Sequence, residues 1–289
     1  YWPASFGSNY SIRSSPGLTI RTPSAPVEVV QVEPAELLEH AIAVHARVRR
    51  QRAGQIDRDR PYWLRRLGLE GHRPAGSREL VCVIARGTDG DGSVDAYATW
   101  SANDGDWYHE YHDQAQAMVT EALAATPDSY LALWQYLLGL DLIRVLSLDA
   151  YPVDEPLEWL LSDGRAARRT WTGDNDWLRL LDVPAALSAR RYGATDRLVL
   201  DVIDRDAGGW AHGKVELDAG PEHAQCRPAA TATADLSLSQ RGLAAIYLGG
   251  NPVRSQQLAG LIDEHTPGAL DRLQAMFATS PAPWNATPF

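Results

Sequence analysis

The sequence is poor in cysteine and in uninterrupted apolar runs. Only two of its 289 residues are cysteines, Cys82 and Cys226, and neither belongs to a CxxC pair or a Cys/His cluster. A disulfide framework and a zinc site are therefore not indicated, and a reducing cytoplasm is the expected compartment. The longest apolar-looking stretch, 131–145, is interrupted by Gln135 and Asp141 and is shorter than the ~20 residues that a spanning helix needs. No membrane span is expected.

Several common catalytic motifs are also missing. The sequence contains no Gly-x-Ser-x-Gly elbow, no Walker phosphate loop and no dinucleotide-binding fingerprint. These absences exclude the commonest motif-bearing hydrolases, NTPases and dehydrogenases. The segment 247–252 contains two glycines, but no strand precedes it and no lysine follows it. It is therefore predicted to be a helix C-cap and a turn.

The densest group of possible metal ligands lies at 107–113, where His109, His112 and Asp113 are close in sequence. A zinc-binding helix needs histidines at i and i+4, whereas these two are three apart in a polar stretch. A solvated hairpin or interface loop is the favoured interpretation, and no metal site is predicted. The other histidines have no catalytic companions at recognisable spacing and are expected at the surface: His40, His45, His72, His212, His223 and His265.

Positive charge is scarce relative to negative charge. Asp and Glu number 37 against 27 Lys and Arg, so the net charge is −10. Nucleic acid and anionic membranes should be repelled, whereas a cationic amine substrate is favoured. The length predicts about two domains. Because the sequence opens on Tyr1 with neither Met nor a signal pattern, we expect the chain to begin inside a longer protein.

Hydrophobic patterning predicts a mixed α/β domain of about 150 residues after a short tail. The tail contains a possible edge strand at 10–13. Helices are expected from Pro34, at 62–64, from the Thr126 N-cap with Pro127 in the first turn, and at 156–161. Strands are expected at 27–30, 80–85, 94–100, 118–123, 143–148 and 169–171.

The pattern changes after Trp177 to a second α/β unit. A helix is expected to start at Val183 and Pro184, and two or three helices should close the chain. Strands are expected at 198–203, 214–218 and 234–239, with one more inside 219–234.

Tryptophan is abundant, with ten residues against three phenylalanines. Trp134 and Trp159 occupy predicted buried helical positions. Trp63 follows a loop rich in Arg and Asp, and Trp177 closes an Asp-rich turn. Aromatic faces beside carboxylates suit an amphipathic cation, so these two tryptophans are candidates for a pocket that binds one; core packing is the alternative for most of the ten.

Several stretches resemble the enhanced intracellular survival (Eis) family of GNAT acetyltransferases. The resemblance extends over most of the chain and includes Ala245-Ile246-Tyr247-Leu248-Gly249-Gly250 and the ending Pro288-Phe289. Its most distinctive part is the run Val183-Pro184-Ala185-Ala186-Leu187. The other matching stretches are 126–134, 138–142, 154–157, 160–163 and 177–187.

The resemblance implies an α/β (α+β) fold in three parts. Residues 1–25 would be the tail of a first GNAT domain, 26–176 a central degenerate GNAT-like domain with a mixed sheet, and 177–289 a sterol-carrier-protein-like domain. The family's pyrophosphate loop, Arg/Gln-x-x-Gly-x-Gly/Ala, is absent from the sequence. Acetyl-CoA, the implied cosubstrate, should therefore be bound mainly by a first domain that this chain lacks, and no cofactor-binding residue is assigned here.

The resemblance also assigns the catalytic groups. The C-terminal carboxylate of Phe289 is the implied general base for the amine, and Tyr1 is the implied general acid for the thiolate if one residue is inserted; without the insertion, Pro3 takes that place. Trp63 and Trp177 match aromatic positions of the amine pocket. The implied protein is a cytoplasmic homo-oligomer, a hexamer, that acetylates an aminoglycoside-like compound, a polyamine or a lysine. The alternative is a non-catalytic sterol-carrier-like module for binding or assembly.

Overall fold

The computed structural model describes residues 1–71, 79–88, 92–103, 115–205 and 209–287. Contacts divide the chain into two compact units. The central unit comprises Gly7–Gly173 with Ala286–Phe289, and the C-terminal unit comprises Tyr1–Phe6 with Asp174–Asn285. The stretch with His109, His112 and Asp113, for which a solvated hairpin or interface loop is the favoured interpretation, lies outside the described residues. No described helix is both long enough and apolar enough to cross a membrane.

The central unit is built on a seven-stranded sheet in the order β3-β4-β5-β6-β7-β2-β8. Strands β3 to β6 form an antiparallel meander, whereas β6 and β7 run parallel. The strands are β2 (Phe6–Arg13), β3 (Val27–Val32), β4 (Val81–Gly87), β5 (Val94–Asn103), β6 (Gln116–Ala124), β7 (Val145–Pro152) and β8 (Ala167–Asp174). The strand predicted at an edge, 10–13, lies instead inside the sheet between β7 and β8, because the later β8 covers its free side.

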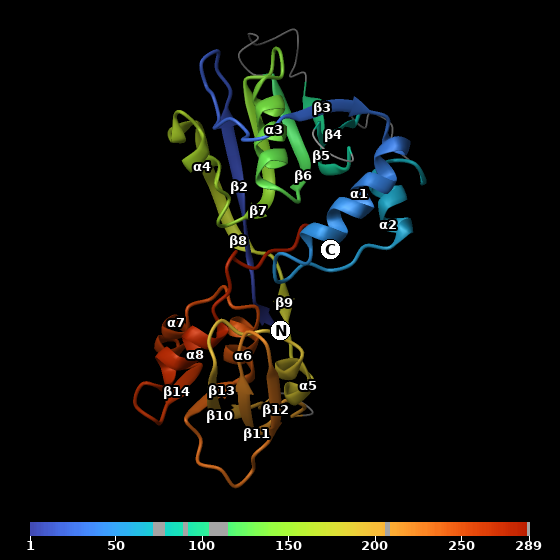
Figure 1. The fold of residues 1–289 in the computed structure, drawn as a ribbon. Helices are drawn as coiled ribbons and strands as arrows, with labels where there is room; N and C mark the ends of the chain where they lie inside the picture. Colours follow the sequence, from blue (N-terminus) through green and yellow to red (C-terminus); the bar gives the residue numbers. More distant parts are fainter. Residues whose placement is uncertain (72–78, 89–91, 104–114, 206–208, 288–289) are drawn as a thin grey trace. The chain divides into compact units, whose positions relative to one another are not determined.

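Helices cover both faces of this sheet (Figure 1). Helix α3 (Pro127–Leu138) packs on β3 to β6 and buries Trp134. Helix α1 (Pro34–Val48) packs on β4, β5 and β6 with its neighbour α2 (Arg60–Arg66), on the opposite face that carries Tyr97. The short helix α4 (Leu157–Leu160) and a 3₁₀ turn at Gly164–Ala166 precede β8.

The predicted start of α3 is confirmed. Thr126 is the N-cap and its hydroxyl accepts a hydrogen bond from the Ser129 N–H, with Pro127 in the first turn. Only two residues connect β6 to this helix, and neither is glycine. Burial of Trp134 is also confirmed, but the same prediction for Trp159 is wrong. Trp159 is 83% exposed because α4 is a single turn that buries Leu157 instead.

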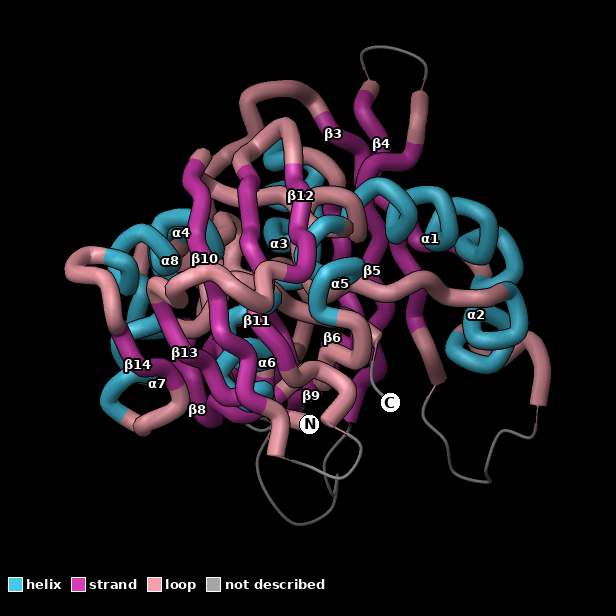
Figure 2. The backbone as a smooth tube through the Cα atoms, turned by 90° about the horizontal axis from the view of Figure 1, so that it is seen from below, coloured by secondary structure: helices cyan, strands magenta, loops and turns pink. Residues whose placement is uncertain are grey.

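The C-terminal unit is built on a five-stranded sheet in the order β12-β11-β10-β13-β14 (Figure 2). All neighbours pair antiparallel except β10 and β13, which run parallel. The strands are β10 (Asp196–Ile203), β11 (Gly213–Ala219), β12 (Ala224–Pro228), β13 (Leu236–Ser239) and β14 (Ile262–Glu264). The helices are α5 (Val183–Ser188), α6 (Gln240–Tyr247), α7 (Val253–Leu258) and α8 (Ala269–Phe277).

The core of this unit lies on one face of the sheet. Leu198, Leu200 and Val202 alternate along β10 and pack with Leu243 of α6 and Leu273 of α8. A separate two-stranded pairing joins β1 (Trp2–Pro3) to β9 (Trp177–Leu178). The predicted C-cap and turn at 247–252 is confirmed, because α6 ends at Tyr247 and Gly249 has a left-handed φ of 90°.

The two units contain one cysteine each, and both cysteines are in the same state. Cys82 in β4 and Cys226 in β12 are both buried and free. Burial raises the pKa of the Cys82 thiol to about 11 and that of the Cys226 thiol to about 12. Both thiols are therefore protonated at neutral pH and behave as small apolar core groups.

Candidate functional site

The central unit contains a buried polar cluster around Arg58, and this cluster holds the end of the chain. Arg58 Nη1 and Nη2 donate to the two carboxylate oxygens of Glu121 at 3.2 and 2.8 Å. The Arg58 Nε donates to the Thr287 hydroxyl at 2.8 Å, and Nη2 also donates to the Ala286 carbonyl at 2.7 Å. The Arg58 side chain is fully buried. One guanidinium thus joins the sheet to the C-terminal tail, which we define as Ala286 and Thr287.

The secondary structure places these groups on one face of the sheet. Asp59 caps α2 by accepting from the Tyr62 N–H, which fixes Arg58 immediately before the helix. Glu121 lies opposite Thr99 of β5, and a register shift follows at once, so that Trp100 pairs with Val119. Tyr97 and Thr99 alternate onto one face of β5, so Glu121, the partner of Thr99, lies on the face that carries Tyr97, whereas Val119 beyond the bulge lies on the opposite face.

Charge compensation keeps the pair ionised. Burial by itself would raise the pKa of Glu121, but the charges of Arg66 and Arg58 and the hydrogen bonds from Arg58 and Tyr97 outweigh it and lower that pKa. The Tyr97 hydroxyl donates to Glu121 at 2.6 Å, and burial and that carboxylate hold the Tyr97 pKa well above its ordinary value. These groups are therefore poor proton carriers, and their geometry suits anchoring.

Aromatic rings complete the wall around Arg58. Its guanidinium carbon lies 4.8 Å from the ring centroid of Trp63 and 5.0 Å from that of Tyr62. Trp63 is 1% exposed and meets Tyr97 edge-on, with centroids 6.4 Å apart. The cation–π contacts add to the ion pair in fixing the guanidinium.

His45 also belongs to this wall, and its predicted place at the surface is wrong. It is 2% exposed, because it lies on the inward face of α1 against Trp63, with the two ring centroids 5.5 Å apart. Burial first, and then the charge of Arg58, lower the pKa of His45 to about 4, so the ring is neutral at pH 7.

The C-terminal unit has a polar network of its own at Asn285, the last residue before the tail in the sequence. Asn285 is 2% exposed, and its side-chain amide donates to Asp176 at 3.1 Å. The other oxygen of Asp176 accepts from Ser5 Oγ at 2.6 Å. The Asn285 N–H donates to the Asn175 side chain at 2.8 Å. Within the C-terminal unit, Asn285 is thus fixed by both its side chain and its backbone.

The sequence-derived site residues fall in both units. Trp63 is in the central unit, where it contacts Arg58. Tyr1 and Trp177 are in the C-terminal unit and are 73% and 50% exposed. Tyr1 immediately precedes β1, which pairs with β9 at Pro3 and Trp177. Phe289 lies outside the described residues, two positions after Thr287.

Sequence reasoning missed Arg58, Glu121 and Tyr97. One signal was available, because Glu121 is a lone charge inside the otherwise uncharged strand β6. A buried carboxylate in a strand requires a cationic partner, although the sequence does not say which of the arginines supplies it. No cluster of potential metal ligands occurs within the described ranges.

Comparison with known proteins identifies the two parts of the chain. The acetyltransferase (GNAT) domain family matches residues 54–180, and the sterol carrier protein domain family matches residues 183–286. An uncharacterized N-acetyltransferase of Streptomyces griseus is 34% identical over 275 residues, which are 93% of this chain and 64% of the relative. The N-acetyltransferase Eis of Mycobacterium tuberculosis is 32% identical over 248 residues, 86% of this chain and 56% of the relative. The chain thus spans less than two thirds of these relatives.

Solved structures give the same result for the fold. Eis1 from Mycobacterium abscessus superimposes with a TM-score of 0.80 and 27% identity, covering 100% of this chain and 69% of that one. A GCN5-related N-acetyltransferase from Anabaena variabilis superimposes with a TM-score of 0.78 and 22% identity, covering 68% of that chain, a likeness that concerns the fold alone. The predicted fold class, a GNAT-like mixed sheet followed by a sterol-carrier-like α/β unit, is confirmed.

Proposed function

We propose, because the chain carries a GNAT acetyltransferase domain followed by a sterol carrier protein domain, that the whole protein is an N-acetyltransferase of the Eis type. GNAT enzymes take acetyl from acetyl-CoA, and the acceptor is an amine. The candidate acceptors are an aminoglycoside-like compound, a polyamine or a lysine side chain, and the net charge of −10 favours such cations. By the same resemblance we propose a hexamer, and the two free, buried thiols favour a reducing cytoplasm.

The observation that supports this proposal most is the anchored tail. Arg58 holds Ala286 and Thr287, and Phe289 follows Thr287 by only two residues in the sequence. An α-carboxylate is ionised at neutral pH and can accept the proton of a substrate ammonium group. The amine nitrogen then attacks the thioester carbon, the bond from that carbon to sulfur breaks, and Tyr1 protonates the departing thiolate.

In this proposal Arg58 is a positioning residue and Phe289 is the catalytic one. Removing Phe289 should lower kcat by about 100-fold or more, the contribution of a general base, and should abolish the acidic limb of the pH profile. Arg58→Gln should lower kcat while the KM for acetyl-CoA stays unchanged. Arg60→Gln is the matched control, because Arg60 is exposed and pairs with Glu39 on the surface.

The experiment measures release of the CoA thiol by the full-length protein with spermidine and with kanamycin as acceptors. Full activity after removal of Phe289 would contradict the proposed base. Calorimetry on residues 1–289 tests the cosubstrate separately. We expect no acetyl-CoA binding by this chain alone, because β6 leads into α3 without a glycine-rich loop; micromolar binding would overturn that part.

A further inference from the structure

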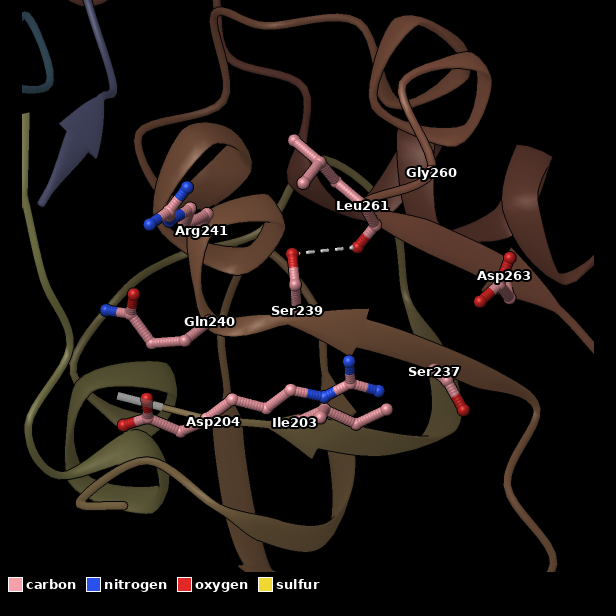
Figure 3. Close-up of a pocket in the computed structure, with 10 residues that line it drawn as sticks. Ile203, Asp204, Ser237, Ser239, Gln240, Arg241, Gly260, Leu261 and Asp263 are labelled. Atoms are coloured by element: carbon pink, nitrogen blue, oxygen red, sulfur yellow. Dashed lines mark hydrogen bonds between the residues drawn. The ribbon is translucent and has the colours of Figure 1, made fainter. Parts of the chain in front are cut away.

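The C-terminal unit has a pocket of about 330 Å³ that the proposed function does not use. Most of its lining residues are polar or charged, and Ile203 and Leu261 are its large apolar residues (Figure 3). This volume suits a small metabolite, since ligand pockets start at about 300 Å³.

The topology favours ligand binding at this place. Strands β10 and β13 are the parallel pair of the sheet, and both end at the pocket, where Ile203 lies beside Ser239. From β10 the chain continues to β11 on one side, and from β13 it continues through α6 and α7 to β14 on the other side. The connections therefore diverge at this point, and in open α/β sheets ligands bind outside the carboxyl ends of strands at such a switch point.

One end of the pocket is electropositive. Helix α6 begins there, with Ser239 as the N-cap that occupies the Gly242 N–H. The N–H groups of Gln240 and Arg241 lie in the first turn, where a helix supplies no partners. The exposed guanidinium of Arg241 stacks over the Trp2 ring at 5.6 Å, and the exposed Arg205 also lines the pocket. Such an arrangement attracts an oxyanion.

Gln240 gives an independent indication of a ligand. The residue is 3% exposed, yet neither its amide nitrogen nor its amide oxygen has a hydrogen-bond partner among the described residues. Its side chain lies on the same side of the pocket as Arg241 and Asp204 (Figure 3). A buried amide without partners is costly, and a bound water, ion or ligand can satisfy such a group.

The carboxylates that line the pocket do not oppose this conclusion. Asp204 accepts from the Ala211 N–H at 3.2 Å and pairs with Arg179 at 3.3 Å, so its charge is already compensated. Asp263 and Ser237 lie across the pocket from Gln240 (Figure 3). That opposite end suits the hydroxyl or amine groups of the same molecule.

We propose that this pocket binds a small polar metabolite through an oxyanion, a phosphate or a carboxylate, held by Arg241, the Gln240 amide and the N-terminus of α6. The proposal does not depend on acetyl transfer. It is tested by ¹H–¹⁵N NMR of the full chain titrated at constant ionic strength with inorganic phosphate, with acetate and with chloride. We expect saturable shifts, largest at Gln240 and Arg241, with phosphate or acetate and none with chloride. The tighter of the two oxyanions identifies the group.

Three variants make the test specific. Arg241→Gln should weaken binding tenfold or more, whereas Arg254→Gln should leave it unchanged, because Arg254 pairs with Asp271 outside the pocket. Gln240→Met should also lose binding, yet its melting temperature should equal or exceed that of the wild type. A residue with a purely structural role would not combine these two effects. The absence of saturable shifts with both oxyanions, or undiminished binding in both pocket variants, would overturn the proposal.

Discussion

One arginine in each unit lies among aromatic rings, and these two, the buried Arg58 and the half-buried Arg190, are stabilised in different ways. Arg58 in the central unit faces the carboxylate of Glu121, which raises its pKa even though burial opposes this. Arg190 in the C-terminal unit has no carboxylate partner within the described part of the chain. It donates to the backbone carbonyls of Tyr247 and Phe277, and burial lowers its pKa.

The carbonyls that Arg190 meets are those of helix ends. Tyr247 and Phe277 are the last residues of α6 and α8. A helix C-terminus carries roughly half a negative charge, so two of them offset about one guanidinium. The rings of Tyr192 and Phe277, each 4.5 Å from the guanidinium carbon, enclose it further. Arg190 therefore fastens two helices, whereas Arg58 fastens the sheet to the tail.

The largest expected effect comes from breaking the charge pair of the central unit. Glu121→Leu leaves the Arg58 guanidinium buried without a counter-charge and should cost about 3–5 kcal/mol in the free energy of unfolding. The double variant with Arg58→Met should be more stable than Glu121→Leu alone, because it removes the uncompensated charge. Urea unfolding gives the free energy of unfolding of the wild type, of Glu121→Leu, of Arg58→Met and of the double variant. Strictly additive costs would contradict the coupling.

Removing Arg190 should have a smaller effect. Arg190→Met leaves helix-end carbonyls without a donor but leaves no unpaired charge, so we expect a loss of about 2–3 kcal/mol. Arg191→Gln is the matched control, because Arg191 is the next residue in the chain and its side chain is exposed. A loss as large as that of Glu121→Leu would remove the distinction between the two arginines. Thermal unfolding combined with urea titration provides the comparison.

A second buried carboxyl sharpens the contrast within the central unit. Glu155 accepts a hydrogen bond from Tyr130, and burial raises its pKa to about 7, only partly offset by Tyr130 and Arg52. As pH rises, the unfolded chain therefore releases this proton at a lower pH than the folded chain does. The free energy of unfolding that Glu155 contributes is lost as pH rises from about 4.5 to about 7.

Glu155→Gln removes this dependence. The difference in the free energy of unfolding, variant minus wild type, should rise by about 2 kcal/mol between pH 5 and pH 8. The exposed Glu158→Gln serves as the control. An identical difference at both pH values would show that the Glu155 carboxyl ionises without penalty. Urea unfolding at the two pH values decides between these outcomes.

The sequence predicted elements whose signals are local. The start of α3 follows from Thr126 and Pro127, because a cap and a fixed φ act within one turn. The turn after α6 follows from Gly249, where the backbone requires a positive φ. Periodicity also located most strands, although β14 was missed because it has only three residues.

Burial of single side chains was predicted less well. His45 was placed at the surface because it has no catalytic companion at recognisable spacing, although it shares the buried face of Ala41 and Val48 on α1. Trp159 was misplaced because helical periodicity identifies a face, whereas the neighbouring element decides whether that face is covered. The edge position expected for 10–13 failed for the same reason, since β8 arrives from more than 150 residues later.

The sequence by itself determined the acidic balance, the α/β class, the helix caps and the resemblance that points to acetyl transfer. Only the tertiary structure decided which charges meet. Simple alternation along β6 puts Glu121 on the face of Val119, but a bulge between them places the two residues on opposite faces, with Glu121 on the face of Tyr97 and Arg58. The partners of that arginine, Glu121 and Thr287, are 63 and 229 residues away. Hydrogen bonding depends on distance in space, and chain folding alone sets that distance.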